Sequence, residues 1–252
     1  MTDASLETRR TVLNAAKVRM RELADYVFKH TGGFVVSGPF ENMKLPDQKS
    51  WGSGDVVPKS LGCYEGELHG AVETAIGRNP DLVINVGCAE GYYAVGLARR
   101  LPGTLVHAFD IDARAQAVCA AAAQENGVHR RIAVAGECTA AHLAALAAGA
   151  ERPLIVIDCE GAEMVLLAEA AMPDLAHADL IVECHDFVDR AITPTLTERL
   201  KPTHAVDLIL EGARDPARFA FMQPLSTLDR WLAVCEYRPE TMHWLACWAN
   251  RT

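Results

Sequence analysis

Three side chains suited to acid–base chemistry or metal binding follow two apolar segments of this 252-residue sequence. Glu183 and His185 come directly after the apolar run 180–182, and their spacing places both on one face of an extended segment. Asp158 ends the run 154–157. An imidazole can act as a general base near neutral pH, and two carboxylates with an imidazole offer a metal a mixed ligand set. The same pattern also fits a simple Glu183–His185 hydrogen bond or the capping of a following helix.

A glycine loop lies upstream, between an apolar run and a helical segment. Residues 85–91 are Asn-Val-Gly-Cys-Ala-Glu-Gly and follow the apolar residues 82–84. Gly87 permits a tight turn, and Gly91 allows a ligand to approach the backbone closely. The free amide groups at the start of the next helix face the same space. An ordinary strand-to-helix turn would use such glycines as well.

Asp110 ends the next apolar run, 105–109, and follows Gly91 by roughly 20 residues, the distance at which nucleoside-binding α/β proteins hold ribose hydroxyls. A dinucleotide fingerprint would need a further glycine where Cys88 and Ala89 stand, and a phosphate loop would end in Gly-Lys-Ser/Thr. The wider glycine spacing therefore favours adenosine without a pyrophosphate. Asp112 is better explained as a helix cap.

These residues require a sheet whose strands end on one side. Apolar runs at 82–86, 105–109, 131–135, 154–157 and 180–182 predict strands, and helical patterns at 92–100, 113–126 and 163–171 alternate with them. Residues 205–210 and 243–248, separated by a helix around 225–235, predict two final strands. This alternation is typical of a parallel sheet covered on both faces. We expect a Rossmann-like, doubly wound α/β fold with a mostly parallel seven-stranded sheet and helices on both faces.

The first 62 residues precede the first expected strand. Residues 5–30 have a helical pattern, and the glycines and prolines of 31–62 predict a loop or hairpin region that includes Trp51. We expect residues 1–62 to form an extension that acts as a lid or as a wall of the substrate pocket, and that allows a homodimer contact. Residues 63–252 would form the main domain.

Composition limits the partners and the location. The formal charge of −9 and the short basic runs argue against a nucleic-acid partner. No apolar run approaches the ~20 residues that span a bilayer, and residues 1–10 are polar, so we expect no membrane partner. The eight cysteines form no CxxC pair, which disfavours a zinc ribbon or a disulfide framework and fits a cytoplasmic protein.

Two motifs carry a resemblance to a known family. Residues 83–93 resemble the first motif of class I S-adenosylmethionine-dependent methyltransferases. Residues 157–163, Ile-Asp-Cys-Glu-Gly-Ala-Glu, resemble the Asp-x-Glu-Gly-x-Glu signature of the FkbM-type branch, and 61–68 is similar to a stretch that precedes the first motif in many members. The resemblance covers roughly residues 35–190. It departs from the family at Asn85, where an acid is usual, since an amide supplies no negative charge.

The resemblance implies S-adenosylmethionine as cofactor and assigns its contacts residue by residue. Contacts with its methionine end and ribose fall to the loop residues Asn85, Gly87, Ala89, Glu90 and Gly91. Asp110 would hold the ribose hydroxyls and Ile111 would pack on the adenine, whose edge Glu137 and Cys138 would contact. Asp158 would lie near the methyl donor.

The implied activity is methylation of a small-molecule acceptor, most simply at a sugar or natural-product hydroxyl. An N- or C-methyltransferase, or a noncatalytic protein that binds S-adenosylmethionine or a nucleotide, would use the same fold. For a hydroxyl acceptor we favour a metal-free base, His185, oriented by Glu183 or Asp158. The alternative is a divalent metal held by these three residues. We expect Glu163 to interact with a helix dipole rather than to take part in catalysis.

Overall fold

The computed structural model describes residues 3–46 and 55–250, and its chain divides into two compact units. The smaller unit combines residues 1–66 with 213–237, and the larger combines 67–212 with 238–252. The sequence pattern places residues 213–237 in the main domain, whereas in the structure they pack with the N-terminal segment. Trp51 lies outside the described residues.

The larger unit contains a seven-stranded sheet with the strand order β3-β2-β1-β4-β5-β7-β6. The strands are β1 (Leu82–Val86), β2 (Leu105–Phe109), β3 (Ile132–Ala135), β4 (Pro153–Ile157), β5 (Asp179–Cys184), β6 (His204–Leu210) and β7 (His243–Ala249). Strands β1 to β5 pair in parallel, and β7 pairs antiparallel with both β5 and β6. The expected Rossmann-like, mostly parallel sheet is confirmed.

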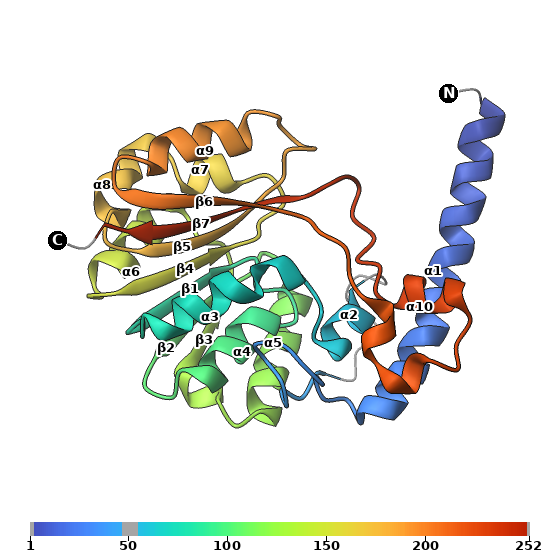
Figure 1. Ribbon diagram of the computed structural model, residues 1–252. Coiled ribbons are helices and arrows are strands. Elements are labelled where there is room, and N and C mark those ends of the chain that lie inside the picture. Colours follow the sequence, from blue (N-terminus) through green and yellow to red (C-terminus); the bar gives the residue numbers. More distant parts are fainter. Residues whose placement is uncertain (1–2, 47–54, 251–252) are drawn as a thin grey trace. The chain divides into compact units, whose positions relative to one another are not determined.

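Helices cover both faces of this sheet (Figure 1). One set comprises α3 (His69–Gly77), α4 (Tyr92–Arg100) and α5 (Ala113–Glu125), and the other comprises α6 (Ala140–Ala148), α7 (Glu163–Leu166), α8 (Met172–Leu175) and α9 (Ile192–Leu200). The core under the second set joins Ile84, Ile155 and Val182 of the central strands to Leu143 of α6 and Leu196 of α9. Every residue of β1, β4 and β5 is buried, which explains why these strands are mostly apolar, with Asn85, Asp179 and Glu183 as the polar exceptions.

The helices of the structure differ from the predicted ones in four places. The expected helix 163–171 is wrong, because α7 ends at Leu166, Ala168 is extended (ψ 149°), and a 3₁₀ turn (Glu169–Ala171) and α8 follow. Helices α6 and α9 were not predicted, although Thr139 caps α6 by accepting a hydrogen bond from the backbone N–H of His142 at 3.2 Å. The helix α2 (Val56–Leu61) lies inside the segment expected to be loop or hairpin.

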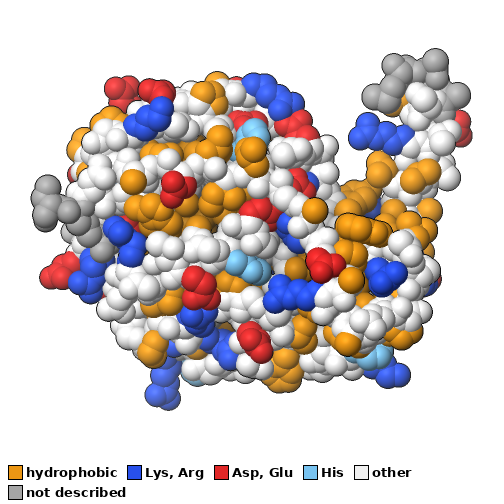
Figure 2. All heavy atoms as spheres, in the orientation of Figure 1, with side chains coloured by type: hydrophobic (Ala, Val, Ile, Leu, Met, Phe, Trp, Pro, Cys, Tyr) orange, Lys and Arg blue, Asp and Glu red, His pale blue; other side chains and the backbone are white. Residues whose placement is uncertain are grey.

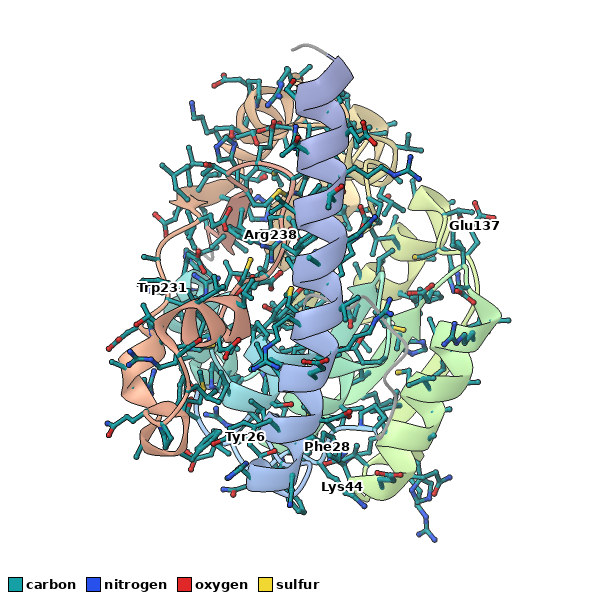
Figure 3. All side chains as sticks on the ribbon, turned by 90° about the vertical axis from the view of Figure 1, so that its right-hand side faces the viewer. Tyr26, Phe28, Lys44, Glu137, Trp231 and Arg238 are labelled. Carbon is teal, nitrogen blue, oxygen red and sulfur yellow. The ribbon has the colours of Figure 1, made fainter. Side chains whose placement is uncertain are left out.

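The smaller unit is built on α1 (Asp3–Thr31), which packs against α2 and α10 (Thr227–Ala233). Leu23 and Val27 of α1 share a core with Phe219 and Met222. Phe219 lies between two 3₁₀ turns (Pro216–Arg218 and Ala220–Met222), and Met222 ends the second of them. The hydroxyl of Tyr26, near the C-terminal end of α1 (Figure 3), donates to the carbonyl oxygen of Phe221 at 2.8 Å. Helix α1 thus holds residues 213–237 through contacts far apart in the sequence.

Apolar side chains gather over strand β6 on the face shown in Figure 2. Strand β6 is an edge of the sheet, and its Leu208 and Leu210 are both exposed. No helix in the described part of the chain is long and apolar enough to cross a membrane.

Candidate active site

The glycine loop connects β1 to α4 with three residues in left-handed conformations. The φ angles are 80° at Gly87, 46° at Ala89 and 93° at Gly91. A Cβ atom at Gly87 would lie 1.5 Å from the carbonyl oxygen of Asp158, and one at Gly91 would lie 2.9 Å from Sγ of Cys119. Both glycines are therefore required by the packing of the chain on itself, whereas the sequence pattern explained Gly91 only by the approach of a ligand.

Asp110 anchors this loop from the end of β2. Its Oδ2 accepts the backbone N–H of Ala89 at 2.9 Å, and its Oδ1 accepts that of Asp112 at 2.9 Å. Each carboxylate oxygen keeps a further lone pair for a ligand. The next side chain, Ile111, is 86% exposed, so a large apolar group is presented beside the carboxylate. Asp112 caps α5, as expected, by accepting the N–H of Arg114 at 2.7 Å.

The remaining residues assigned to the cofactor lie in different environments. Asn85 and Glu90 are buried, and Oδ1 of Asn85 has no hydrogen-bond partner within the described part of the chain. Glu137 is exposed in the loop after β3 (Figure 3). The side chain of Cys138 belongs to the core cluster under α6, and burial raises the pKa of its thiol to about 11. A ligand could therefore meet Cys138 through its backbone rather than through a reactive thiolate.

His185 is held by a carboxylate to which the sequence pattern assigned no catalytic role. Its Nδ1 lies 2.6 Å from Oε1 of Glu163, the first residue of α7, and both side chains are buried. An ionised carboxylate only accepts hydrogen bonds, so Nδ1 donates to it. The same Oε1 accepts the N–H of Gly161 at 3.1 Å. Glu163, rather than Glu183 or Asp158, orients the imidazole.

The other ring nitrogen of His185 faces two carboxylates from the turn after β4. Its Nε2 lies 3.5 Å from Oδ1 of Asp158 and 3.5 Å from Oε2 of Glu160. Because Nδ1 is already engaged, Nε2 is the nitrogen available to a ligand. Asp158 also lies beside the glycine loop, since its carbonyl group meets Gly87, so His185 and the loop share one end of the sheet.

Glu183 lies close to this cluster but has its own partner. One oxygen each of Asp158 and Glu183 and one nitrogen of His185 all lie within 4.8 Å of one another. Nη1 of Arg238 donates to Oε1 of Glu183, and the Arg238 guanidinium lies 4.9 Å from the ring centre of Trp244. The three predicted residues do converge, and Glu183 and His185 are each bonded to a different residue rather than to one another.

The charges around His185 shift the pKa of both members of its hydrogen-bonded pair. Burial lowers the pKa of His185, but the bond to Glu163 and the negative charges of Asp158, Glu163 and Glu160 outweigh burial and raise it. Burial raises the pKa of Glu163, but its bonds from His185 and Gly161 outweigh burial and lower it. The pair therefore favours an imidazolium beside a carboxylate.

The sequence motif includes Glu163, but the spacing of the motif's acids does not show that Glu163 binds His185. Glu163 is the last acid of the Asp-x-Glu-Gly-x-Glu motif, and Glu160 is its middle acid. Their positions along the chain do not show which of them turns inward. The turn at Glu160 and Gly161, with φ angles of 53° and 106°, directs Glu163 into the core and leaves Glu160 outside.

The fold has counterparts of low sequence identity among solved structures. The cofactor-bound protein Rv0187 from MTB matches with a TM-score of 0.50 at 15% identity, over 75% of this chain and 82% of that chain. The O-methyltransferase TomG from Streptomyces achromogenes, in complex with SAM, gives a TM-score of 0.48 at 13% identity, over 75% and 82%. An O-methyltransferase from Bacillus cereus, in complex with SAH, gives 0.49 at 10% identity, over 74% and 82%. No family model and no curated protein matches the sequence.

Proposed function

We propose that this chain is a class I S-adenosylmethionine-dependent methyltransferase of the FkbM type that methylates a hydroxyl group of a small molecule. The observation that carries the proposal is the buried Glu163–His185 pair, with Nδ1 fixed at 2.6 Å from the carboxylate, next to the glycine loop. An oriented imidazole at the carboxyl ends of parallel strands suits a general base that acts on a ligand held there.

The residues of the loop fit the proposed cofactor. S-adenosylmethionine, when bound, supplies a methyl group activated by its sulfonium. The Asp110 carboxylate suits ribose hydroxyls, the exposed Ile111 suits an adenine face, and the buried Oδ1 of Asn85 offers an unused acceptor to a polar group. Glu137, exposed after β3, remains our candidate for the adenine edge.

The proposed role of His185 is to take the proton of the acceptor hydroxyl. With the cofactor bound, Nε2 would accept this proton while the acceptor oxygen takes the methyl group and S-adenosylhomocysteine leaves. The Glu163 carboxylate stabilises the imidazolium that results and holds the ring in position. Much of the remaining rate gain comes from alignment of the two reacting groups.

A metal-assisted mechanism is the second candidate, and the convergence of Asp158, Glu183 and His185 within 4.8 Å is the observation that favours it. Two carboxylates and an imidazole suit Mn²⁺ or another transition metal. The bond between Arg238 and Glu183 counts against it, because a metal would compete with the guanidinium for that carboxylate.

Isotope-labelled methyl donor and calorimetry test the proposal together. We expect S-adenosylmethionine and S-adenosylhomocysteine to bind, and an acceptor library to yield an O-methylated product. His185→Ala should lower turnover by ~10²–10⁴-fold while cofactor affinity stays constant. His129→Ala, an exposed histidine in a 3₁₀ turn, is the matched control and should retain activity.

Chelation separates the candidates. With a metal-free base, EDTA leaves activity unchanged. Loss of activity with EDTA, recovery with Mn²⁺ or Mg²⁺, and equal damage from Asp158→Ala and Glu183→Ala would establish the metal mechanism instead. Cofactor binding with no product from any acceptor would favour a noncatalytic binding protein, and methylation at nitrogen or carbon would contradict the hydroxyl assignment.

A further inference from the structure

The turn after β4 presents two carboxylates on one side of the His185 ring. Glu160 and Gly161 both have positive φ angles, and a Cβ atom at Gly161 would lie 2.9 Å from Cγ1 of Val188. The chain therefore makes a tight bend in which Asp158 and Glu160 approach the same nitrogen. The Glu160 side chain is 81% exposed and the Asp158 side chain 36% exposed, so both side chains reach solvent.

Nε2 of His185 forms no short hydrogen bond with either of these carboxylates. Both N···O distances to Nε2 of His185 are 3.5 Å, longer than the ~2.7–2.9 Å of a charge-assisted hydrogen bond. The imidazole is itself buried, with 4% of its side chain exposed, and only Nδ1 is engaged by a hydrogen bond within the described part of the chain. Nε2 thus lies between the two carboxylates without a hydrogen bond of ordinary length, and a hydroxyl of a ligand can bind there in its place.

Apolar side chains border the carboxylates. The Phe187 ring lies edge-on to His185, with 5.5 Å between ring centres, and is partly exposed. Val188 of the same loop is exposed and lies close to Gly161 of the turn. A ligand of this site therefore meets both hydrogen-bond acceptors and apolar side chains. A saturated ring with hydroxyl groups on its edge and C–H groups on its face has this character.

The negative charges of the site disfavour acceptors that carry an anionic group near the reacting hydroxyl. A phosphate or carboxylate next to the reacting hydroxyl would lie close to the negative charges of Asp158 and Glu160, and like charges at short range repel. A hydroxyl donates to a carboxylate without such a penalty, and hydrogen bonds to charged acceptors are stronger than neutral ones.

We infer that Glu160 determines acceptor specificity by accepting a hydrogen bond from the hydroxyl adjacent to the one that His185 deprotonates. The acceptor is accordingly an uncharged ring with a vicinal diol, such as a sugar or a cyclitol. The two oxygens of a vicinal diol are close enough for one to reach Nε2 while the other reaches Glu160. This inference rests on the proposed function, because it takes His185 as the base.

Binding of matched ring probes to the protein saturated with S-adenosylhomocysteine tests the inference even while the natural acceptor is unidentified. The probes are cis-cyclohexane-1,2-diol, cyclohexanol and cis-2-hydroxycyclohexanecarboxylate, with dissociation constants measured by saturation-transfer NMR. We expect the diol to bind about tenfold more tightly than cyclohexanol, the gain expected from one hydrogen bond to a charged acceptor. The carboxylate probe should bind more weakly than either.

Variants then assign the preference to Glu160. Glu160→Ala should weaken binding of the diol about tenfold, to the affinity of cyclohexanol. Glu160→Gln should retain part of the diol preference and bind the carboxylate probe better than wild type does. Glu169 is an exposed acid in a 3₁₀ turn and serves as the control. Glu169→Ala should change neither the affinity for the diol nor the affinity for the carboxylate probe.

Three results would overturn the inference: equal affinity for diol and cyclohexanol, an unchanged diol affinity in Glu160→Ala, or no detectable diol binding. Affinity for S-adenosylhomocysteine is measured first in every variant. Failure to bind that molecule contradicts the proposed function, whereas normal binding with no diol preference contradicts only the role of Glu160.

Discussion

At the scale of single residues, the site depends on the different environments of three acids around one imidazole. Glu163 is buried and bonded to Nδ1 of His185, whereas Asp158 and Glu160 are partly or largely exposed near Nε2. A buried carboxylate fixes the ring, since it has few other partners, and an exposed one can meet a ligand. Position relative to the core, rather than residue type, separates these roles.

The pH dependence of turnover should report the Glu163–His185 pair. The base form of His185 is unprotonated, so kcat should rise with pH through a pKa above the ordinary imidazole value. Glu163→Gln removes the negative charge and should move this rise to lower pH with a lower plateau. A pH profile of kcat for both proteins measures the shift, and an identical profile would remove Glu163 from the pair.

The free energy of unfolding should depend on pH through the same group, His185. Because the folded pKa of His185 is raised, its contribution to stability is fully present below the unfolded pKa and is lost as pH rises through the folded pKa.

Asp110 and Asp112 offer a matched pair of acids two residues apart. Asp110→Ala should weaken S-adenosylmethionine binding by ~1–3 kcal/mol, because ribose hydroxyls lose a partner and the N–H of Ala89 loses its anchor. Asp112→Ala should instead cost ~0.5–2 kcal/mol of stability through the lost α5 cap, with little effect on binding. Calorimetry and thermal unfolding separate the two effects, and unchanged affinity in Asp110→Ala would exclude it from the site.

At the scale of elements, the glycine loop is a packing device as well as a candidate ligand cradle. Gly87 lets the end of β1 meet the backbone after β4, and Gly91 lets α4 approach Cys119 of α5. These contacts fix where the loop and Asp158 lie relative to one another. Substitutions at either glycine therefore act on the fold before they act on a ligand.

Gly91→Ala should destabilise the protein by ~1–3 kcal/mol, because φ is 93° and the new Cβ would lie 2.9 Å from Sγ of Cys119. The larger Gly91→Val should be worse and should also abolish cofactor binding. Gly103→Ala is the control, since nothing lies within 4 Å of its added Cβ. Thermal unfolding of both variants makes the comparison, and a Gly91→Ala protein as stable as Gly103→Ala would contradict the packing role.

At the scale of the whole molecule, the chain leaves its N-terminal unit at residue 66, builds most of the sheet, returns at 213–237, and ends with β7. Residues 213–237 depend on α1 for their core, through Leu23 and Val27. Residues 213–237 and the N-terminal segment therefore form one packed unit. Removing residues 1–62 alone would also strip residues 213–237 of their packing.

A point substitution tests this unit with less damage. Leu23→Ala should lower stability by ~2–5 kcal/mol, because Leu23 is fully buried, and Leu6→Ala on the exposed part of the same helix should change stability little. Both variants should keep wild-type cofactor affinity, because the glycine loop and Asp110 belong to the other unit. Turnover that falls in Leu23→Ala but not in Leu6→Ala supports the proposed wall, and unchanged turnover in both would contradict it.

Local sequence patterns were enough to place the strands and helices from β1 to α5, the glycine loop and the acids at strand ends. Segments 82–86, 92–100 and 105–109 match their elements to the residue, because burial pattern and glycine position are local properties of the chain. The convergence of Asp158, Glu183 and His185 could also be predicted from the sequence, since parallel strands bring their carboxyl ends to one edge of the sheet.

The partners that these residues take became known only from the packing of distant segments. Glu163 and His185 are 22 residues apart, and Glu183 and Arg238 are 55 apart, so neither pairing leaves a trace in local periodicity. The antiparallel insertion of β7 between β5 and β6 and the union of residues 213–237 with α1 are equally non-local. The physical reason is that a local pattern records whether a side chain is buried, whereas its hydrogen-bond partner depends on how distant segments pack around it.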